Sequence, residues 1–411
     1  MKVLMFGWEF PPFKTGGLGT ACYDLTRGLS CKGIDVIFVM PKTPENAKSD
    51  FVKLIGANNL YGSIKMRKVS TILTPYMSSE AYSSELRRFR MSHETSSEVY
   101  GQNLYQEVIR YAEMAKIIAA QEDHDLIHAH DWMTYLAGIN ARNISGKPLV
   151  VHIHATEFDR TGGNPNPMIS HLEYTGLNEA DLIIANSNFT KNNVIRHYNI
   201  NPDKIKVVHW GIDPENPYYN LNYSSPMNKN EKIVLFLGRV TIQKGPDYFI
   251  EVAKKVLDFK KNVRFVIAGS GDMLPRIIER AAELGISDKV TFTGFLHGAD
   301  VHRAFQMADL YVMPSTSEPF GLVALESLKN NTPVIISKQS GVSEVLHNAL
   351  KVDFWDINEM TNKIVNVLNY EELHHELEKN SFQEVQKFNL IKPAEKCIDA
   401  YNEAIRGAKR W

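Results

Sequence analysis

Short apolar runs alternate with longer stretches of helical period along the first half of the chain. Runs of this length are typical of strands that are buried on both faces of a parallel sheet. The pattern predicts strands at 3–6, 36–39, 126–128, 149–153 and 182–185. Apolar residues at helical spacing predict helices near 19–32, 103–121 and 188–198. Segment 75–102 is rich in Ser, Tyr and Glu, and we expect a loop or a small subdomain there.

The same alternation begins again in the second half of the chain. Apolar runs predict strands at 233–237, 263–268, 290–293, 310–313 and 333–336. Helices are predicted between them, near 247–260, 273–284, 299–307 and 320–329. Repeated β-α-β units of this kind form doubly wound parallel sheets. The predicted fold class is therefore α/β, with two Rossmann-like sheets.

The length of the chain and one atypical segment indicate two domains. A chain of 411 residues is too long for one ordinary core. Residues 214–230 hold three prolines and five asparagines with almost no apolar period, so they are the natural linker. We expect domains at 1–213 and 214–390, followed by a last helix in 391–411.

Composition changes this picture little, but it excludes some classes of partner. The 46 basic and 47 acidic residues give no overall field that would attract nucleic acid or an anionic membrane. We interpret the short basic clusters at 65–68 and 87–90 as solvated surface. Three cysteines without metal-site spacing favour free thiols in a reducing compartment. The apolar run 3–6 is too short for a signal peptide or a membrane span, so we expect a cytoplasmic protein.

The first candidate binding element is a glycine-rich turn, Lys14-Thr15-Gly16-Gly17-Leu18-Gly19, between the first strand and the first helix. Glycines let backbone N–H groups approach an anion, and a helix N-terminus adds positive potential, which suits a diphosphate. An ordinary strand-to-helix turn is the alternative. Neither this turn nor Gly269-Ser270-Gly271 matches the dinucleotide fingerprint, and no acidic residue about 20 positions later ends a predicted strand.

The second candidate is the pair Arg239 and Lys244, which follows the first strand of the second domain. Ligands of doubly wound sheets bind beyond the carboxyl ends of the strands. Two cations at such a position are suited to stabilise the charge that develops on a leaving diphosphate. Solvated surface charge is the alternative.

The third candidate is a pair of glutamates, Glu318 and Glu326, after the strand predicted at 310–313. Pro319 suits the first position of a helix, which would leave the N–H groups of Gly321 and Leu322 facing a ligand. A helix through both glutamates would separate them by about 12 Å at ~1.5 Å per residue. They would then contact different parts of one elongated ligand, such as a hexose and a ribose. Helix capping by Glu318 and solvent exposure of Glu326 are the alternatives.

Together these motifs resemble the large retaining glycosyltransferase family four. The similarity rests on Glu-x7-Glu, on Gly-Arg-x4-Lys-Gly upstream, on the early Gly-Gly-Leu-Gly, and on His154 after the strand at 149–153. It covers nearly the whole chain. The resemblance implies the GT-B architecture, with two Rossmann-like domains facing a central cleft and a last helix that crosses back to the first domain. It also implies an acceptor side at 1–213 and a nucleotide-sugar side at 214–390.

The resemblance implies a role for each candidate residue. Arg239 and Lys244 would hold the donor diphosphate. Glu318 would hold the transferred hexose, and Glu326 the ribose. The remaining donor contacts would come from His154 near the anomeric carbon, from Gly321 and Leu322, and from Gly16 and Gly17 over the phosphates.

Finer matches are similar to the glycogen and starch synthase subset. They are Trp8-Glu9-Phe10-Pro11-Pro12, His128-Ala129-His130-Asp131-Trp132 and Lys14 within Lys-x-Gly-Gly-Leu. Lys14 would approach the donor phosphate, or would be an exposed turn charge. The subset implies ADP-glucose or UDP-glucose as donor and an α-glucan as acceptor. Surface polysaccharide or glycolipid synthesis is the alternative, although no apolar segment favours membrane association.

We expect neither a cofactor nor a metal ion. Asp123-His124-Asp125 is interpreted as exposed loop, and His128, His130 and Asp131 as strand residues on opposite faces, with the last two lining the cleft. Both glutamates are assigned to donor binding, so front-face displacement is favoured over a glycosidase-like double displacement. A nucleotide-sugar epimerase does not need Glu-x7-Glu, and a non-catalytic carbohydrate-binding protein does not need all the charged candidates.

Overall fold

The computed structural model describes residues 1–11, 17–42, 49–57, 104–213, 219 and 231–408. Contacts within the chain divide it into two compact units. Unit 1 comprises Met1–Gly211 with Leu390–Trp411, and unit 2 comprises Ile212–Asn389. Segment 75–102, both basic clusters and all of the expected linker except Tyr219 lie outside the described residues.

Unit 1 is built on a seven-stranded sheet with the order β3-β2-β1-β4-β5-β6-β7. Every neighbouring pair is parallel. The strands are β1 (Lys2–Phe6), β2 (Asp35–Met40), β3 (Lys53–Gly56), β4 (Leu126–His130), β5 (Leu149–Ile153), β6 (Leu182–Ala185) and β7 (Ile205–Val207). All residues of β4, β5 and β6 are buried, because helices cover both faces of the sheet.

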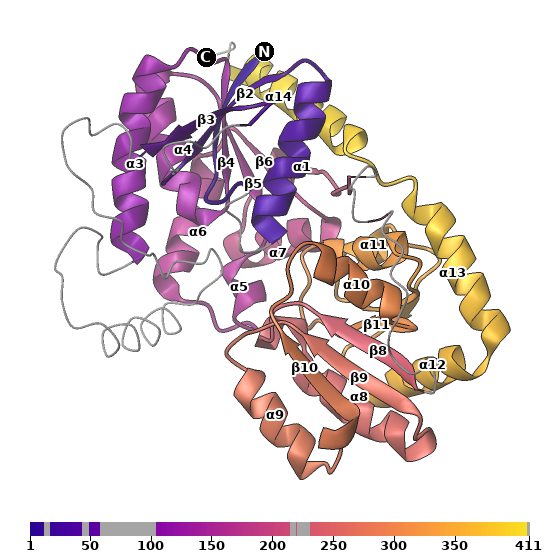
Figure 1. Ribbon diagram of the computed structural model, residues 1–411. Helices are drawn as coiled ribbons and strands as arrows, with labels where there is room; N and C mark the ends of the chain where they lie inside the picture. Colours follow the sequence, from indigo (N-terminus) through magenta and orange to yellow (C-terminus); the bar gives the residue numbers. More distant parts are fainter. Residues whose placement is uncertain (12–16, 43–48, 58–103, 214–218, 220–230, 409–411) are drawn as a thin grey trace. The chain divides into compact units, whose positions relative to one another are not determined.

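The helices of unit 1 pack in two groups (Figure 1). They are α1 (Gly17–Cys31), α3 (Leu104–Gln121), α4 (Trp132–Ser145), α5 (Glu157–Arg160), α6 (Pro167–Glu179), α7 (Asn188–Tyr198) and α14 (Ile391–Ala408). Helix α4 contacts α3 and α6, whereas α1 packs against the C-terminal α14. A Cβ atom at Gly28 of α1 would lie 2.4 Å from the Leu390 carbonyl oxygen, so glycine is required for this close approach.

Unit 2 repeats this architecture with a six-stranded sheet of order β10-β9-β8-β11-β12-β13. Its strands are β8 (Lys232–Leu237), β9 (Val263–Ala268), β10 (Val290–Gly294), β11 (Leu310–Met313), β12 (Val334–Ser337) and β13 (Leu350–Val352). Its helices are α8 (Pro246–Phe259), α9 (Leu274–Glu283), α10 (Ala299–Met307), α11 (Leu322–Lys329), α12 (Ile357–Asn369) and α13 (Glu371–Val385). Helix α8 packs on α9 and α12, while α11 packs on α10 and α13.

The predicted fold class is confirmed, since both units are α/β with parallel Rossmann-like sheets. Each predicted strand coincides with an observed one to within two residues. The hydrophobic pattern missed β3, β7 and β13, and it also missed α4, α5, α6, α12 and α13. The three missed strands all lie at sheet edges, where most of their residues are only partly buried and leave no continuous apolar run.

Strand order reverses at one place in each sheet. In unit 1, β2 lies on one side of β1 and β4 lies on the other side. In unit 2, β9 and β11 flank β8 in the same way. Loops from the carboxyl ends of these strand pairs diverge there and leave room for a ligand. The loops after β1, β4, β8 and β11 are therefore the places to look for a site.

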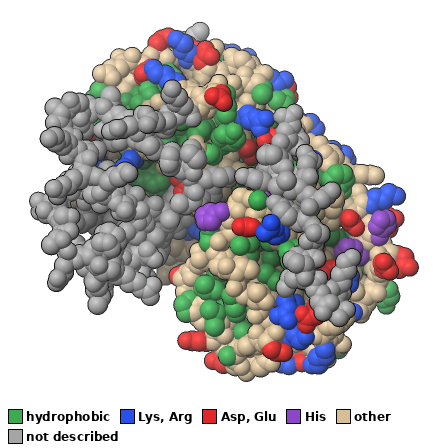
Figure 2. Space-filling model, viewed as in Figure 1, with side chains coloured by type: hydrophobic (Ala, Val, Ile, Leu, Met, Phe, Trp, Pro, Cys, Tyr) green, Lys and Arg blue, Asp and Glu red, His purple; other side chains and the backbone are tan. Residues whose placement is uncertain are grey.

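The face drawn in Figure 2 carries side chains of both signs of charge. On the face drawn in Figure 2, basic and acidic side chains are interspersed, which agrees with the net charge of −1. Among the described residues, no helix combines the length and the apolar character needed to span a membrane.

A buried ion network joins α5, α6 and α7. Arg160 Nε donates to Glu157 Oε2 at 2.9 Å, and another guanidinium nitrogen of Arg160 bonds Glu173. Glu173 also accepts from the Tyr198 hydroxyl and from the Glu157 backbone N–H. The side chains of Arg160, Glu157 and Glu173 are almost completely removed from solvent. The Glu173 carboxylate therefore compensates a buried cation and links three helices.

We expect Glu173→Gln to lower the free energy of unfolding by about 3 kcal/mol, because removing one charge of a buried ion pair leaves its partner poorly compensated. Chemical denaturation followed by circular dichroism measures the change. Glu113→Gln is the matched control, since its ion pair with Lys116 is exposed and its loss should have little effect. Equally small effects of the two substitutions would contradict a stabilising role for the buried network.

Candidate active site

The loop after β8 is fixed against its neighbours by close backbone contacts. It contains Gly238, the 3-10 turn η4 (Ile242–Lys244) and Gly245, whose φ of 67° is left-handed. A Cβ atom at Gly245 would lie 2.1 Å from the Pro314 carbonyl oxygen, just after β11. A Cβ atom at Gly269, after β9, would lie 1.8 Å from the Gly238 carbonyl oxygen. These glycines therefore let the loops after β8, β9 and β11 converge.

Convergence of these loops brings a cation and a carboxylate into direct contact. Lys244 Nζ lies 2.5 Å from Glu318 Oε2, and the Ser315 hydroxyl donates to the same oxygen at 3.0 Å. The side chains of Lys244 and Glu318 are 18% and 7% exposed, so the pair is largely shielded but reachable. The two residues are 74 positions apart in sequence and meet because β8 and β11 are neighbours.

Arg239 lies in the same loop and is half-buried. Its NH2 group donates to the buried Gln243 Oε1 at 3.2 Å. Gln243 also binds the β11 loop, since its carbonyl oxygen accepts from the Thr316 N–H at 2.9 Å. Sequence reasoning missed Gln243 and Ser315 as supporting residues, although Gln243 lies inside the Gly-Arg-x4-Lys-Gly motif.

The segment around Glu318 differs from the prediction. Helix α11 begins at Leu322, so Pro319 is not its first residue and Glu318 is outside the helix. The Glu318 N–H donates to the Gln339 carbonyl oxygen, and the Glu318 carbonyl oxygen accepts from the Gly341 N–H, both at 2.9 Å. Gly321 caps α11 with a φ of 111°, which a helix does not allow. The predicted axial separation of about 12 Å between Glu318 and Glu326 therefore does not apply.

Glu318 and Glu326 nevertheless share one neighbourhood. Burial raises the pKa of the Tyr311 hydroxyl well above its usual range, and negative charge on Glu318 and Glu326 adds to this shift. Tyr311 Oη donates to the Leu237 carbonyl oxygen at 3.3 Å, at the end of β8. Glu326 is half-buried, one turn into α11. The N–H groups at the start of α11, including that of Leu322, have no partner within the helix. Unit 2 thus gathers two carboxylates, two cations and a helix N-terminus at its β8/β11 reversal.

In unit 1, the predicted site residues are described only in part. Gly17 is exposed and is the first residue of α1, so it lies where the chain leaves the β1 loop. Lys14 and Gly16 lie outside the described residues.

His154 lies immediately after β5 and is held from several sides. Its Nε2 lies 2.9 Å from His130 Nδ1, and its ring centre is 5.0 Å from that of Trp210. Its backbone N–H donates to Asp131 Oδ1 at 2.7 Å, and its carbonyl oxygen accepts from Asn186. Burial lowers the pKa of the His154 imidazole well below its usual range, and neighbouring histidines add to this effect. His154 is therefore a neutral, rigidly placed group.

Two expectations about β4 are wrong. His128 and His130 do not point to opposite faces: they are two residues apart in a strand, so they share a face, and their ring centres are 4.2 Å apart. His130 and Asp131 do not line an open surface either, since they are 0% and 1% exposed. Asp131 has a φ of 60°, which is rare outside glycine, and its carboxylate binds His154 instead of capping α4. These residues support His154 from inside unit 1.

The Asp123-His124-Asp125 string lies at the opposite, amino end of β4. Asp125 Oδ2 accepts the Lys2 backbone N–H at 2.8 Å, and Asp123 pairs with Lys2 Nζ at 3.2 Å. Asp123 is 86% exposed. As predicted, the two aspartates are exposed, but His124 between them is buried, so the prediction of an exposed loop is wrong for that residue.

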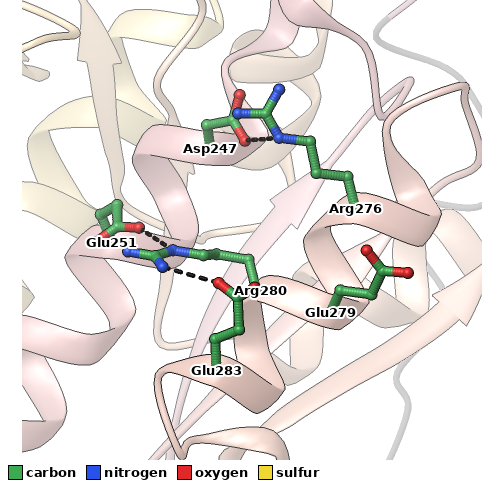
Figure 3. Close-up of a pocket in the computed structure, with 6 residues that line it drawn as sticks. All are labelled: Asp247, Glu251, Arg276, Glu279, Arg280 and Glu283. Atoms are coloured by element: carbon green, nitrogen blue, oxygen red, sulfur yellow. Dashed lines mark hydrogen bonds and ion pairs between the residues drawn. The ribbon is translucent and has the colours of Figure 1, made fainter.

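A cavity of about 390 Å³ lies between α8 and α9 and is separate from the convergent loops. Figure 3 shows its charged lining, in which Arg280 pairs with Glu251 and Glu283, while Arg276 pairs with Asp247. The arginines are compensated by carboxylates that outnumber them. This groove is therefore unsuited to an anionic nucleotide.

Two family patterns match the chain. The family described as Glycosyltransferase Family 4 matches residues 15–216, and Glycosyl transferases group 1 matches residues 221–384. The first match spans β2 to β7, and the second includes Arg239, Lys244, Glu318 and Glu326. The matches together cover every strand of both sheets except β1, and they include the convergent loops of unit 2.

Relatives and solved structures agree with these matches. An uncharacterised glycosyltransferase of Methanocaldococcus jannaschii is 33% identical over 359 residues, 84% of this chain and 83% of the relative. D-inositol 3-phosphate glycosyltransferase of Gordonia bronchialis is 30% identical over 312 residues, 70% of this chain and 68% of the relative. Sucrose-phosphate synthase of Thermosynechococcus elongatus has a similar fold, with a TM-score of 0.73, 20% identity and 99% coverage of both chains. HepE of Anabaena, solved with UDP-glucose, has a TM-score of 0.69 at 19% identity and covers 98% of this chain and all of its own.

The chain has two Rossmann-like sheets, and cations and carboxylates gather where the strand order of the second sheet reverses. This fold and these groups are those of a nucleotide-sugar-dependent enzyme. The chain belongs to the group 1 glycosyltransferases, family 4, which have the GT-B fold. It is accordingly a retaining glycosyltransferase that uses a nucleotide-sugar donor.

If Lys244 and Arg239 stabilise the leaving diphosphate as the sequence predicts, we expect Lys244→Ala and Arg239→Ala each to lower turnover by roughly two to four orders of magnitude. Steady-state turnover at saturating donor measures the loss, and circular dichroism checks that the variants fold. Lys254→Ala is the control, since Lys254 is on the surface of α8 and pairs only with Asp258 among the described contacts. Near-normal turnover in either site variant would reject the leaving-group role.

Proposed function

We propose that this protein transfers a hexose, with glucose as the first candidate, from a nucleoside diphosphate sugar to a carbohydrate acceptor. The contact between Lys244 and Glu318 carries this proposal. The bond that breaks in such a donor joins a sugar to a phosphate. A cation for the phosphate and a carboxylate for the sugar hydroxyls, 2.5 Å apart, match the two sides of that bond.

In this proposal, donor binding replaces the ion pair with contacts to the ligand. Lys244 and Arg239 bind the diphosphate, and the first N–H groups of α11 at Gly321 and Leu322 add positive potential. Glu318 accepts hydrogen bonds from the hexose, and Glu326 accepts them from the ribose. The charge on the leaving group grows as the bond stretches, so the cations stabilise the transition state more than the bound donor.

Residues of unit 1 are assigned to the same donor by the family resemblance. Gly16 and Gly17 bring backbone N–H groups to the phosphates, and Lys14 adds a cation. His154 is neutral because burial lowers its pKa, so it provides a hydrogen bond near the anomeric carbon without competing for the proton.

We propose front-face displacement as the route to retention. The acceptor oxygen forms a bond to the anomeric carbon on the face from which the diphosphate leaves, and the bond from that carbon to the phosphate oxygen breaks. The proton of the acceptor hydroxyl passes to that phosphate oxygen. A double displacement needs a free carboxylate as nucleophile, and both glutamates are assigned to binding the donor.

An α-glucan is the first candidate acceptor, with ADP-glucose or UDP-glucose as donor. Its support is Lys14 within Lys-x-Gly-Gly-Leu, together with Trp8 to Pro12 and His128 to Trp132, all similar to glycogen and starch synthases. The segment from His128 to Trp132 is buried, so it belongs to the core of unit 1 and does not contact an acceptor directly. The acceptor is therefore supported less strongly than the donor.

A small phosphorylated acceptor is the second candidate. The name of one relative, D-inositol 3-phosphate glycosyltransferase, and that of one solved neighbour, sucrose-phosphate synthase, both include a sugar or cyclitol phosphate. A phosphate on the acceptor would need cations besides Arg239 and Lys244, which are assigned to the donor. A precursor of surface polysaccharide or glycolipid is a third possibility.

Glu318 and Glu326 should affect different steps. Because Glu318 binds the hexose, we expect Glu318→Gln to lower turnover while leaving the affinity for UDP or ADP nearly unchanged. Because Glu326 binds the ribose, Glu326→Ala should weaken that affinity by about tenfold, which corresponds to ~1.4 kcal/mol. Calorimetry with each nucleoside diphosphate alone makes the comparison, and Glu359→Ala, at an exposed ion pair on α12, is the control. Equal losses of affinity in both variants would reject this division.

The acceptor is tested with radiolabelled ADP-glucose and UDP-glucose. Each donor is incubated with glycogen, with maltooligosaccharides, with inositol 3-phosphate and with hexose phosphates, and products are separated by size and charge. We expect label in the glucan. Label only in a phosphorylated small product would favour the second candidate, and label from another nucleotide sugar in a lipid would reject both.

A further inference from the structure

Four histidines form a cluster inside unit 1, and the proposed transfer reaction uses only one of them, His154. His128 and His130 alternate along β4, and His152 and His154 alternate at the end of β5. His130 is the register partner of His152, so the strand pairing brings the two histidine pairs side by side. None of the four is more than 3% exposed.

Most ring nitrogens of this cluster have no hydrogen-bond partner among the described residues. They are His128 Nε2, His130 Nε2, both nitrogens of His152 and Nδ1 of His154. A buried polar atom without a partner destabilises a fold, because it has lost its hydrogen bonds to water and gained none in exchange. Several such atoms in one place indicate a ligand that satisfies them together.

The remaining nitrogens have the partners that metal-binding histidines have. His128 Nδ1 lies 2.8 Å from the Tyr401 hydroxyl, and His130 Nδ1 lies 2.9 Å from His154 Nε2. A histidine that binds a metal through one nitrogen donates the other N–H to a neighbouring acceptor, which fixes the ring. With Nδ1–H donated to Tyr401 and to His154, the Nε2 lone pairs of His128 and His130 are free to coordinate.

The spacing of the rings also fits one ion. The candidate ligand nitrogens of His128, His130 and His152 all lie within 4.8 Å of one another. With Zn–N bonds of about 2.0–2.1 Å, two imidazoles on one tetrahedral ion have ring centres roughly 5 Å apart. The observed separations are 4.2 Å for His128 and His130, 5.2 Å for His130 and His152, and 5.6 Å for His128 and His152.

We propose that His128, His130 and His152 bind one transition-metal ion, with Zn²⁺ as the first candidate. Three neutral imidazoles are the ligands that Zn²⁺, Cu²⁺, Ni²⁺ and Co²⁺ accept, whereas Mg²⁺ and Ca²⁺ require oxygen. A cavity of about 20 Å³ borders His152 and Trp210. It has room for roughly one water molecule as the fourth ligand.

The proposed ion has a structural role and is separate from the chemistry at Lys244 and Glu318. It joins β4 to β5 and, through Tyr401, to α14. It also fixes His130, the residue that bonds His154. The ion itself stabilises no leaving group.

The metal content of the full-length protein tests this proposal. Tag-free protein is purified from cells grown with added Zn²⁺, dialysed against a weak chelator and analysed by mass spectrometry of the elements. We expect about one ion per chain, as in closed structural zinc sites. Wild-type protein without bound metal would overturn the proposal.

Protein from cells grown with added Co²⁺ identifies the ligands. A site of three histidines gives visible cobalt bands without a charge-transfer band from thiolate. A thiolate band that disappears in Cys22→Ser would overturn this ligand set, because Cys22 is close to His130 and His154 in a second possible arrangement.

Substitutions complete the test. We expect His152→Gln and His128→Gln to lose the ion, and Tyr401→Phe to bind it more weakly. His124→Gln, at a buried histidine outside the cluster, is the control and should keep it. Retention of the full metal content in both His152→Gln and His128→Gln would also overturn the proposal, and wild-type metal content decides the question if these variants do not fold.

Discussion

The convergence of strand ends at the order reversal of a parallel sheet is the constraint on which the candidate site depends. In unit 2, β8 and β11 are neighbours in the sheet, although β9 and β10 lie between them in the chain. Lys244 and Glu318 meet only because of this pairing. In unit 1, the adjacency of β4 and β5 likewise brings His130 to His154. Each unit thus places the polar groups of its candidate site at the carboxyl ends of strands.

Glycines at two positions make this convergence sterically feasible. At Gly245 and Gly269 any side chain would collide with a backbone carbonyl of the neighbouring loop. Backbone atoms cannot move aside as a flexible side chain can, so the loops hold Lys244 and Arg239 in a fixed relation to β11. A rigid placement of charge is what electrostatic catalysis requires, because groups that must reorganise during the reaction contribute less. The Gly-Arg-x4-Lys-Gly motif therefore combines two cations with one glycine, Gly245, whose close contact with the loop after β11 positions them.

The sequence was sufficient to predict the internal strands, the fold class and the loops that carry charge, because buried parallel strands leave continuous apolar runs. It was insufficient where tertiary pairing overrides local pattern. The predicted start of α11 was wrong because the Glu318 backbone hydrogen-bonds to the loop after β12. The residues near Pro319 do not indicate that contact. The histidines of β4 were misassigned through an error in strand geometry, since alternate residues share a face. Their contact with His152 and His154 could not be read from the sequence, which does not state which strands are neighbours.

The return of α14 to unit 1 has a consequence for the order in which the protein is made. Cys397, Ala400 and Tyr401 are buried in the core of unit 1, yet the ribosome adds them after all of unit 2. The surface of α1 around Gly28 therefore stays uncovered while the second sheet is synthesised, so the unit that begins first is completed last. A chain that stops before residue 390 retains every strand of both sheets. It lacks the helix that packs against α1, and it also lacks the Tyr401 hydroxyl that contacts His128 Nδ1. Only chains that include α14 can therefore close the first core, which couples the stability of unit 1 to the synthesis of this helix.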